Sequence, residues 1–460
     1  MSLQNQVSKS FNKIFRRCFI KRRQNDGTYE SEWQDVSKYV KKWGKIRREI
    51  DSSRLSKFRF RGMTLVMQNE EGTFNPWTND ASLWFGFSDI QRTLFKIEAG
   101  YLEQTQGADG IWINTEYPST AEWDMGHWDS AKWDDQAIAF TGIIYGNIAI
   151  STKNEVALPI QPVTEVFRQY SARNIGGYND SLTASKFIEL VRDHTDGSSN
   201  YVFRPFFGDT TTNWEIATTT SIFANLNTST ADDVRDNTVW KVMEKLSEAE
   251  NHVPFIGRDG KFIFKDRADI TTTIAWEFHG QGTFNRTYGH NIIDIRNFAP
   301  KPNKYYSRVS LKWKDANTTT SFEIRESTLT VGNSTAWIFG ERTFAFTNTW
   351  IQTATVAQTL AQTLFDDYSS LKQEINVIAP FTPELDILDL VSVTYDASPT
   401  LEENLWDVRD WAADNTSTST DLIWDANTGE ALKLSAEEFK IISVEDDLDK
   451  FRTIVQARET

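Results

Sequence analysis

The sequence predicts a β-rich α+β fold, in which two strand-rich regions flank a small unit of helices and a hairpin. Aromatic residues make up 13% of the chain, and such residues favour strands. Apolar residues alternate with polar ones in many short runs, which is the period of a half-buried strand. Apolar residues at helical spacing, by contrast, occur in only a few segments.

The length and the cysteine content are typical of a multidomain protein from a reducing compartment. At about 100–200 residues per domain, 460 residues correspond to about three domains. Cys18 is the single cysteine, which excludes an intrachain disulfide and suits a reducing cytoplasm. The sequence has no apolar run long enough to cross a bilayer, so we expect no stable membrane insertion.

Charge is distributed unevenly along the chain. The net charge is −15, but residues 1–61 contain 17 Lys and Arg against 6 Asp and Glu, a balance of +11. The remaining 399 residues have a balance of −26. The acidic bulk disfavours tight nucleic-acid binding, because that binding requires Lys and Arg to neutralise phosphates.

Residues 1–27 are predicted to form a basic amphipathic N-terminal arm. Apolar residues recur there at helical spacing, at Phe11, Ile14, Phe15, Cys18 and Phe19. The accompanying basic residues are Lys13, Arg16, Arg17, Lys21, Arg22 and Arg23. Such a helix docks either on its own protein or in an acidic groove of a partner. Its apolar face is short, so a membrane surface is the weaker candidate.

Residues 28–170 are predicted to form the first strand-rich domain. Phe58 and Phe60 alternate with polar residues, and the apolar phase shifts after Gly62. A phase shift at a glycine indicates a β-bulge. Residues 104–136 are expected to be a long loop insertion in this domain.

Residues 171–299 are predicted to form an α+β connecting region. Helical apolar spacing occurs at 183–194 and again from residue 239, where Asn237 and Thr238 are plausible N-caps. Two apolar runs around Asp259 and Gly260 predict a hairpin over 253–264.

Residues 300–460 are predicted to form the second strand-rich domain. Strands are expected at 305–314 and 319–327, a helix at 353–368, and further strands from residue 374 onward. Residues 397–432 are expected to be a second long insertion, so the domain consists of 300–396 together with 433–460.

The sequence contains no motif with a known catalytic or cofactor-binding mechanism. The five histidines include no pair at metal-ligand spacing, and phosphate-binding and nucleophile-elbow motifs are absent. We therefore predict a protein that is not an enzyme and has no cofactor or bound metal.

Tryptophan followed by aspartate recurs in both predicted insertions. Exposed tryptophan requires a partner surface, which is a neighbouring subunit, a receptor or glycan, or another part of the same chain. The candidate interaction residues are Trp123, Trp128, Trp133, Trp406, Trp411 and Trp424.

Several segments resemble tail hub proteins of tailed bacteriophages and related particles. Residues 33–40 read WQDVSKYV and residues 69–74 read NEEGTF, similar to the opening of minor tail proteins. Residues 383–393 read PELDILDLVSV, similar to a hub segment in which Leu388 stands where glycine is usual. Residues 439–444 and 452–459 resemble the closing strands of that family.

This resemblance implies two tail-tube-like antiparallel β-barrels with a small α+β domain between them. It also implies a homotrimeric ring at the virion tail tip, formed after folding in the host cytoplasm. The implied partners are the tail tube or a distal tail protein, a tape measure protein, and a central fibre or spike, with DNA passing through without specific binding. The alternative functions are a receptor- or glycan-binding tail protein that uses the tryptophan loops, and a glycan-degrading enzyme.

Overall fold

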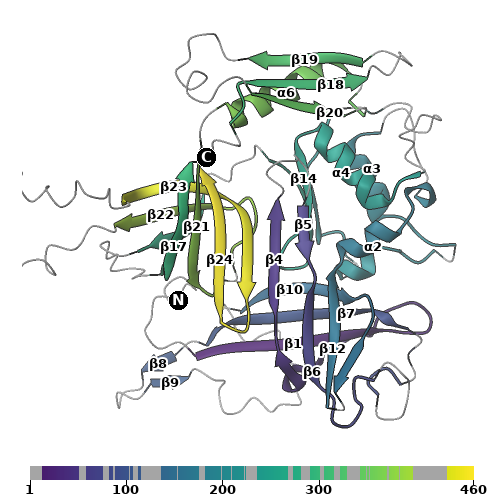
Figure 1. The fold of residues 1–460 in the computed structure, drawn as a ribbon. Coiled ribbons are helices and arrows are strands. Elements are labelled where there is room, and N and C mark those ends of the chain that lie inside the picture. The colour runs from purple at the N-terminus through teal and green to yellow at the C-terminus, as the bar shows by residue number, and fades with distance from the viewer. Residues whose placement is uncertain are drawn as a thin grey trace, which may run out of the picture.

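Two large β-sheets dominate the structure, which is a computed structural model. The structure describes residues 13–50, 58–75, 82–85, 87, 89–102, 104–106, 112–114, 136–152, 154–175, 182–197, 199–208, 210–221, 223, 236–267, 273–280, 291–300, 305–314, 322–328, 342–348, 350–351, 353–369, 372–382, 384–396 and 433–459. Each large sheet has eight strands, and three smaller sheets accompany them in this part of the chain. Figure 1 shows the first large sheet at the bottom, the C-terminal one at the left, and the helices at the right and top.

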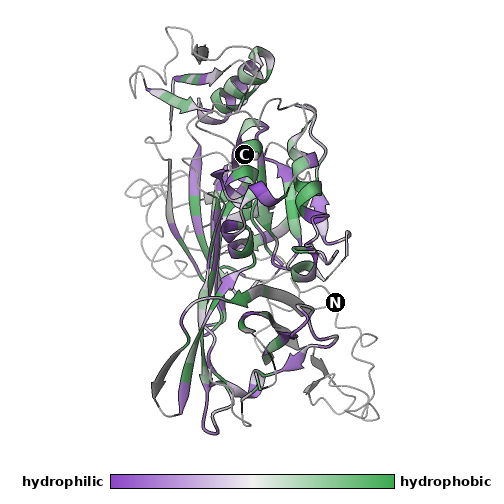
Figure 2. Cartoon of the chain, turned by 90° about the vertical axis from the view of Figure 1, so that its right-hand side faces the viewer, coloured by the Kyte–Doolittle hydropathy of each residue, from purple (hydrophilic) through white to green (hydrophobic). Residues whose placement is uncertain are grey.

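The first large sheet is antiparallel and has the order β2-β1-β7-β10-β12-β6-β3, with β11 paired to β12. Its strands show the alternation of hydrophobic and hydrophilic residues that the sequence predicts (Figure 2). The strands are β1 Lys13–Arg23, β2 Gln34–Asp35, β3 Val40–Lys42, β6 Met63–Gln68, β7 Asp89–Leu102, β10 Gln136–Ile144, β11 Ala149–Thr152 and β12 Glu155–Pro162.

One short segment occupies both ends of this first sheet. β2 pairs with β1 at one end of the strand order, and β3 pairs with β6 at the other end. Only the 3₁₀ turn Ser37–Tyr39 and one flanking residue separate β2 from β3. The two ends of the sheet are therefore connected by residues 34–42, so the sheet curls toward itself.

The helix predicted for the N-terminal arm is wrong over residues 13–23, which form strand β1. This strand lies inside the first sheet between β2 and β7. Cys18 and Ile20 are fully buried on one face, while Phe15 and Phe19 lie on the other. Because both faces of the strand carry apolar residues, their combined spacing imitates that of a helix.

The α+β unit agrees with the helices and the hairpin that the sequence predicts. Helices α3 and α4 begin after Thr183 and Thr238, whose side chains accept hydrogen bonds from the backbone N–H groups three residues later. Such N-caps satisfy donors that the helix leaves unpaired. The elements are α2 Thr164–Gln169, α3 Ala184–Arg192, β13 Trp214–Ile216, α4 Val239–Ala249, β14 His252–Ile256 and β15 Phe262–Asp266, with 3₁₀ turns Ala172–Asn174 and Arg204–Phe207.

The second large sheet has the order β16-β22-β23-β24-β21-β17, and β4 and β5 extend it. All its pairings are antiparallel except that of β16 with β22. Asn291 links the end of β16 to the start of β17, since its N–H donates to the His279 carbonyl at 3.0 Å. The strands are β4 Lys45–Ile50, β5 Phe58–Arg61, β16 Ile274–His279, β17 Asp294–Pro300, β21 Gln373–Pro380, β22 Leu390–Asp396, β23 Lys433–Asp447 and β24 Arg452–Glu459.

Strands β4 and β5 depart from the predicted division of the chain. They lie within the range 28–170 predicted for the first domain, yet β4 pairs with β23 of the C-terminal sheet. Gly62 does not form a bulge: β5 before it belongs to the second sheet, and β6 after it belongs to the first. A side chain at Gly62 would meet the Ile160 carbonyl at 2.7 Å, so glycine is required where the chain passes β12.

A separate small unit also departs from the predicted second domain. Strands β18 Arg308–Lys314, β19 Phe322–Thr328 and β20 Thr343–Thr347 form a three-stranded sheet that is not paired with the large one. Helix α6 Ala354–Tyr368 contacts this sheet and begins one residue after the predicted start, with Thr353 as its N-cap. Two further short strands, β8 Gln104–Gln106 and β9 Trp112–Asn114, pair within the first predicted insertion.

Candidate functional site

The segment at 33–40 attaches to strand β1 through side-chain and backbone hydrogen bonds. The Asp35 carboxylate accepts from the Ser37 N–H at 2.8 Å and from its hydroxyl at 2.5 Å. The Ser37 hydroxyl accepts from the Cys18 N–H at 2.8 Å, and the Val36 N–H donates to the Cys18 carbonyl at 2.8 Å. Val36 is completely buried. The Asp-Val-Ser triplet therefore fixes the turn between β2 and β3 against the first sheet.

The segment at 69–74 forms a turn that packs against the first motif. The Asn69 side-chain oxygen accepts from the Phe74 N–H at 2.7 Å, and the Gly72 N–H donates to the Asn69 carbonyl at 3.2 Å. Gly72 has φ +75°, a conformation that favours glycine. The turn buries Phe74 completely, with its ring edge-on to Tyr39 at a centroid distance of 5.2 Å.

Residues Trp43 and Gly44 connect the N-terminal motif to the turn between β23 and β24. Their N–H groups donate to the Asp449 carboxylate at 2.9 and 3.1 Å. On the other side of the turn, Arg16 of β1 donates to the Leu448 carbonyl at 2.6 Å, and its guanidinium lies 5.8 Å from the Trp43 ring centroid. The first sheet and the C-terminal hairpin thus share one set of contacts.

We call the region where residues 43–48, the turn at 385–389 and the hairpin of β23 and β24 meet the Arg48 junction. Arg48 forms its buried centre. Its side chain is 1% exposed and contacts two carboxylates, Asp386 at 3.2 Å and Asp446 at 3.1 Å. It also donates to the Leu385 carbonyl at 3.3 Å. Asp446 accepts a further hydrogen bond from the Thr453 hydroxyl at 2.7 Å. One arginine from the N-terminal part of the chain therefore ties together β4, β23 and the turn before β22.

In the turn before β22, Leu388 occupies the position where the similar hub segment usually has glycine. Leu388 has φ +69°, the left-handed conformation that glycine adopts without strain. Its N–H donates to the Ile441 carbonyl at 2.9 Å, and the Ile441 N–H donates to the Asp389 carbonyl at 2.9 Å. The turn expected for glycine is therefore present with leucine, whose side chain is buried.

The buried charges of the junction perturb one another. The guanidinium groups of Arg48 and Arg258 lie near the carboxylates of Asp386, Asp389 and Asp446. Burial raises the pKa of Asp389 to about 6, and the neighbouring Asp386 carboxylate adds to this increase. Burial also raises the pKa of Asp446, and the Arg48 guanidinium opposes that rise.

The basic residues of the predicted arm have defined positions in the folded chain. Arg22 pairs with Glu30 at 2.5 Å and donates to the Leu83 carbonyl. Arg23 donates to the Gly27 carbonyl at 3.2 Å, and the Lys21 ammonium lies 5.9 Å from the Trp33 ring centroid. Together with Arg16, these contacts show that residues 13–23 belong to the sheet and do not extend away from it.

Six tryptophans are predicted to form contacts, and all of them lie outside the described residues. They are Trp123, Trp128, Trp133, Trp406, Trp411 and Trp424. The side chain of Lys13 is likewise outside them, as is Phe11. Sequence reasoning missed Arg48 and Asp446, because their contact joins residues that are 398 positions apart. The hub-like segments around these two residues are the only sequence signal of their position.

The junction is suited to holding structural units together. In the part of the chain that the structure describes, no three His, Cys, Asp or Glu side chains are grouped so that they could hold a metal ion. Within the same residues, no helix is long and apolar enough to cross a membrane. The acidic and basic groups of the junction are engaged with one another and with backbone carbonyls.

Comparison with known proteins shows similarity to phage tail proteins at low identity. No family model and no curated protein matches the chain. Among solved structures, a tail protein from Neisseria meningitidis MC58 is 10% identical, with a TM-score of 0.49 and 96% of each chain covered. The 43 kDa tail protein of prophage MuSo2 from Shewanella oneidensis is 12% identical, with a TM-score of 0.46 and coverage of 96% of this chain and 98% of the other.

A third solved structure is prophage tail protein gp18 from Listeria monocytogenes EGD-e. It is 9% identical, has a TM-score of 0.42, and covers 96% of this chain and 94% of its own. Each of the three proteins is named a tail protein.

Proposed function

We propose that this chain is the structural hub of a phage tail tip, forming a ring that joins the tail tube to a central fibre or spike. The observation that carries this proposal is the convergence of the hub-like segments. Residues 43–46 of the opening segment, the turn at 385–389 and the closing strands β23 and β24 all meet at the Arg48 junction. A ring subunit needs its two halves held rigidly, and this junction provides the connection.

The two large sheets support a hub with two barrel-like domains per chain. In the first sheet, residues 34–42 contact strands at both ends of the strand order. In the second, Asn291 bridges the ends formed by β16 and β17. Three copies with two such domains each would present six sheets to a six-fold tail tube, while keeping three-fold symmetry for a central fibre.

Charge supports a channel that DNA crosses without being held. The chain after Arg61 has a balance of −26, and acidic walls repel phosphate. Two basic residues of β1 are engaged inside the protein, since Arg16 donates to the Leu448 carbonyl and Arg22 pairs with Glu30. These two guanidinium groups are therefore not part of a surface patch that would retain DNA.

The partners follow from the position of a hub. The tail tube or a distal tail protein would lie on one side of the ring, and the tape measure protein and the central fibre or spike would contact the other side or the channel. We assign the tryptophan loops of both insertions to contacts between subunits or with these neighbours. Interfaces are enriched in tryptophan because it contributes large contact areas.

The copy number of the chain in purified particles tests the proposal. Quantitative mass spectrometry, calibrated on the tail-tube protein of the same particles, should give three copies per tail. Six or twelve copies would contradict the hub, because two sheets per chain would then exceed the six positions of the tube.

Substitution of the tryptophans in the first loop distinguishes the hub function from the receptor- or glycan-binding function. Replacing Trp123, Trp128 and Trp133 by Ala should reduce particle assembly, since interface aromatics cost about 2 kcal/mol or more each when truncated. Assembly is measured as the yield of tailed particles. A variant that assembles normally but fails to adsorb to cells would identify a receptor- or glycan-binding protein instead.

A further inference from the structure

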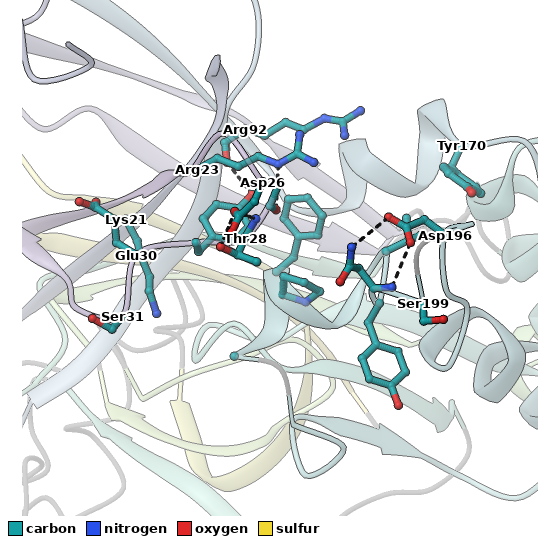
Figure 3. Close-up of a pocket in the computed structure, with 18 residues that line it drawn as sticks. Lys21, Arg23, Asp26, Thr28, Glu30, Ser31, Arg92, Tyr170, Asp196 and Ser199 are labelled. Carbon is teal, nitrogen blue, oxygen red and sulfur yellow. Dashed lines mark hydrogen bonds between the residues drawn. The ribbon is translucent and has the colours of Figure 1, made fainter. Parts of the chain in front are cut away.

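A cleft of about 650 Å³ lies between the turn that follows β1 and the loop after α3 (Figure 3). One wall comes from Lys21, Arg23, residues 26–31 and Arg92, and the other comes from Tyr170, Asp196, residues 199–202, Pro205, Phe206 and Gly208. The volume is in the range of small-molecule sites, about 300–1,000 Å³, and such sites are frequent where structural units meet.

One ring contact joins the two walls, and hydrogen bonds hold each wall internally. The Tyr29 hydroxyl donates to the Arg92 carbonyl at 2.8 Å, and the Tyr29 ring lies edge-on to Phe206 at a centroid distance of 5.8 Å. In the opposite wall, the Asn200 N–H donates to the Asp196 carboxylate at 3.0 Å. The cleft is therefore formed before any ligand arrives, which lowers the entropy cost of binding.

Two residues of the cleft have a strained backbone. Arg92 has φ +69° and Ser199 has φ +66°. A long side chain rarely adopts this conformation, which costs about 1–2 kcal/mol, and such strain is concentrated at functional sites. At Arg92 it turns the carbonyl toward Tyr29 while the side chain lines the cleft.

The charges of the cleft favour an anionic ligand. Three cations and three carboxylates line it, and the Arg22 guanidinium, which is not part of the lining, offsets Glu30, so one positive charge is in excess. Asp26 accepts two hydrogen bonds from Thr28, which lower its pKa, and Asp196 accepts from Asn200. Arg92 takes part in no ion pair with any described residue, so no carboxylate in the part of the chain that the structure describes matches its five donors.

An exposed aromatic ring adds a stacking surface. Tyr201 is 38% exposed, and the Arg204 guanidinium lies 3.8 Å from its ring centroid, so it covers one face of the ring and restricts its movement. Tyr170 lies on the same wall, where its hydroxyl is hydrogen-bonded to His194 at 2.8 Å. Pyranose rings present C–H groups that pack on tyrosine, while their hydroxyls bond to polar side chains.

We infer that this cleft binds an acidic saccharide, with the anionic group at Arg92 and Lys21 and a sugar ring on Tyr201. The inference goes beyond the hub function, and it is independent of assembly because all the residues belong to one chain. The cleft is also separate from the tryptophan loops to which the alternative function was assigned.

Isothermal titration calorimetry of the purified full chain tests this inference. The probes are trigalacturonate, trehalose 6-phosphate, uncharged maltotriose and hexaglutamate. Binding of one or both acidic saccharides in preference to maltotriose is expected, and their ranking distinguishes a carboxylate from a phosphate. Failure of both at millimolar concentration would overturn the inference. Tighter binding of hexaglutamate than of either saccharide would also overturn it, and would identify an acidic protein segment as the occupant.

Matched variants locate the binding. Arg92→Gln and, separately, Lys21→Gln should weaken the acidic saccharide by about tenfold or more, because each removes a charge-assisted hydrogen bond. Arg92→Lys should retain part of the affinity. Lys186→Gln removes an exposed lysine of α3, which pairs with Glu189 and does not line the cleft, and should leave affinity unchanged. Equal affinities of Arg92→Gln and Lys186→Gln, both folded by circular dichroism, would overturn the assignment.

Discussion

The two large sheets are stabilised by different interactions. The strands of the first sheet pack around an apolar core, and none of the charged side chains described in them is buried. In the second sheet, charged residues from several strands are buried, namely Arg48, Glu374, Asp446, Asp447 and Arg458. Both sheets have an apolar core, but in their described strands only the second also buries charged side chains, such as the Arg48–Asp446 pair across a long sequence separation.

This difference indicates how each sheet responds to change. An apolar core loses stability in proportion to the side-chain volume removed. A buried ion pair behaves otherwise, because removing one partner leaves the other charged and desolvated. Arg48 contacts two carboxylates, so the second sheet and its junction with the N-terminal segment should be the more sensitive region.

The largest effect is expected for Arg48→Met. The variant leaves Asp446 and Asp386 without their guanidinium, which should cost about 3–5 kcal/mol of unfolding free energy. Chemical denaturation followed by tryptophan fluorescence measures the change, and hydrogen exchange of the β4 amides should show local opening.

The matched control is Arg47→Met in the same strand. Arg47 is 35% exposed and pairs with Glu49 at 2.7 Å, and a pair at the surface contributes about 0–1 kcal/mol. Equal costs for the two variants would contradict the view that burial makes the junction sensitive.

The second effect concerns pH and Asp389. Its pKa is raised to about 6 in the folded chain, so the folded state holds this proton more tightly than the unfolded state. The stability that it contributes is present below about pH 4, falls as pH rises through 6, and is lost above it. Relative to wild type, Asp389→Asn should therefore become more stable by up to about 3 kcal/mol between pH 4 and 7.5.

Denaturation midpoints at several pH values test this expectation. Asp366→Asn, at an exposed position of α6, is the control and should leave the pH profile unchanged. A wild-type profile that runs parallel to that of Asp389→Asn across this range would show that Asp389 is ionised in the folded chain without cost.

In the first sheet, Asn69→Ala should have a moderate effect. It removes the acceptor of the buried Phe74 N–H, which lies 2.7 Å away, and leaving a buried donor unpaired costs about 1–3 kcal/mol. Gln68→Ala, one residue earlier and less buried, is the control for thermal melting. A loss as large as that of Arg48→Met would remove the distinction between the two sheets.

The smallest effect is a difference between two substitutions at Leu388. Both Leu388→Ala and Leu388→Gly remove the buried side chain, but only glycine relieves φ +69°. The glycine variant should therefore be more stable than the alanine variant by about 1–2 kcal/mol, which chemical denaturation resolves. The opposite order would mean that the turn does not keep its left-handed residue.

Local elements of the fold were predictable because their signals are local. The helices that follow Thr183, Thr238 and Thr353 carry both an N-cap and helical apolar spacing, and all three are confirmed. The hairpin around Gly260, which has φ +80°, is confirmed for the same reason. Turn chemistry and periodicity act over a few residues, so the sequence displays them directly.

Long-range placement was not predictable in the same way. Strand β1 was mistaken for a helix because a strand with two apolar faces has the same composition as a basic amphipathic helix. The pairing of β4 with β23 joins residues about 400 positions apart, such as Lys45 and Asp447. Nothing in local propensity reports such a pairing, and only the quoted hub-like segments indicated that the two regions belong together.

Cryo-electron microscopy of the intact tail tip tests the central claim most directly. The account predicts three copies of this chain in a ring directly below the tail tube, with both large sheets of each copy surrounding the channel and the Arg48 junction inside each subunit. Density that places the chain outside the tube axis, as a peripheral fibre or an adsorption protein, would contradict it.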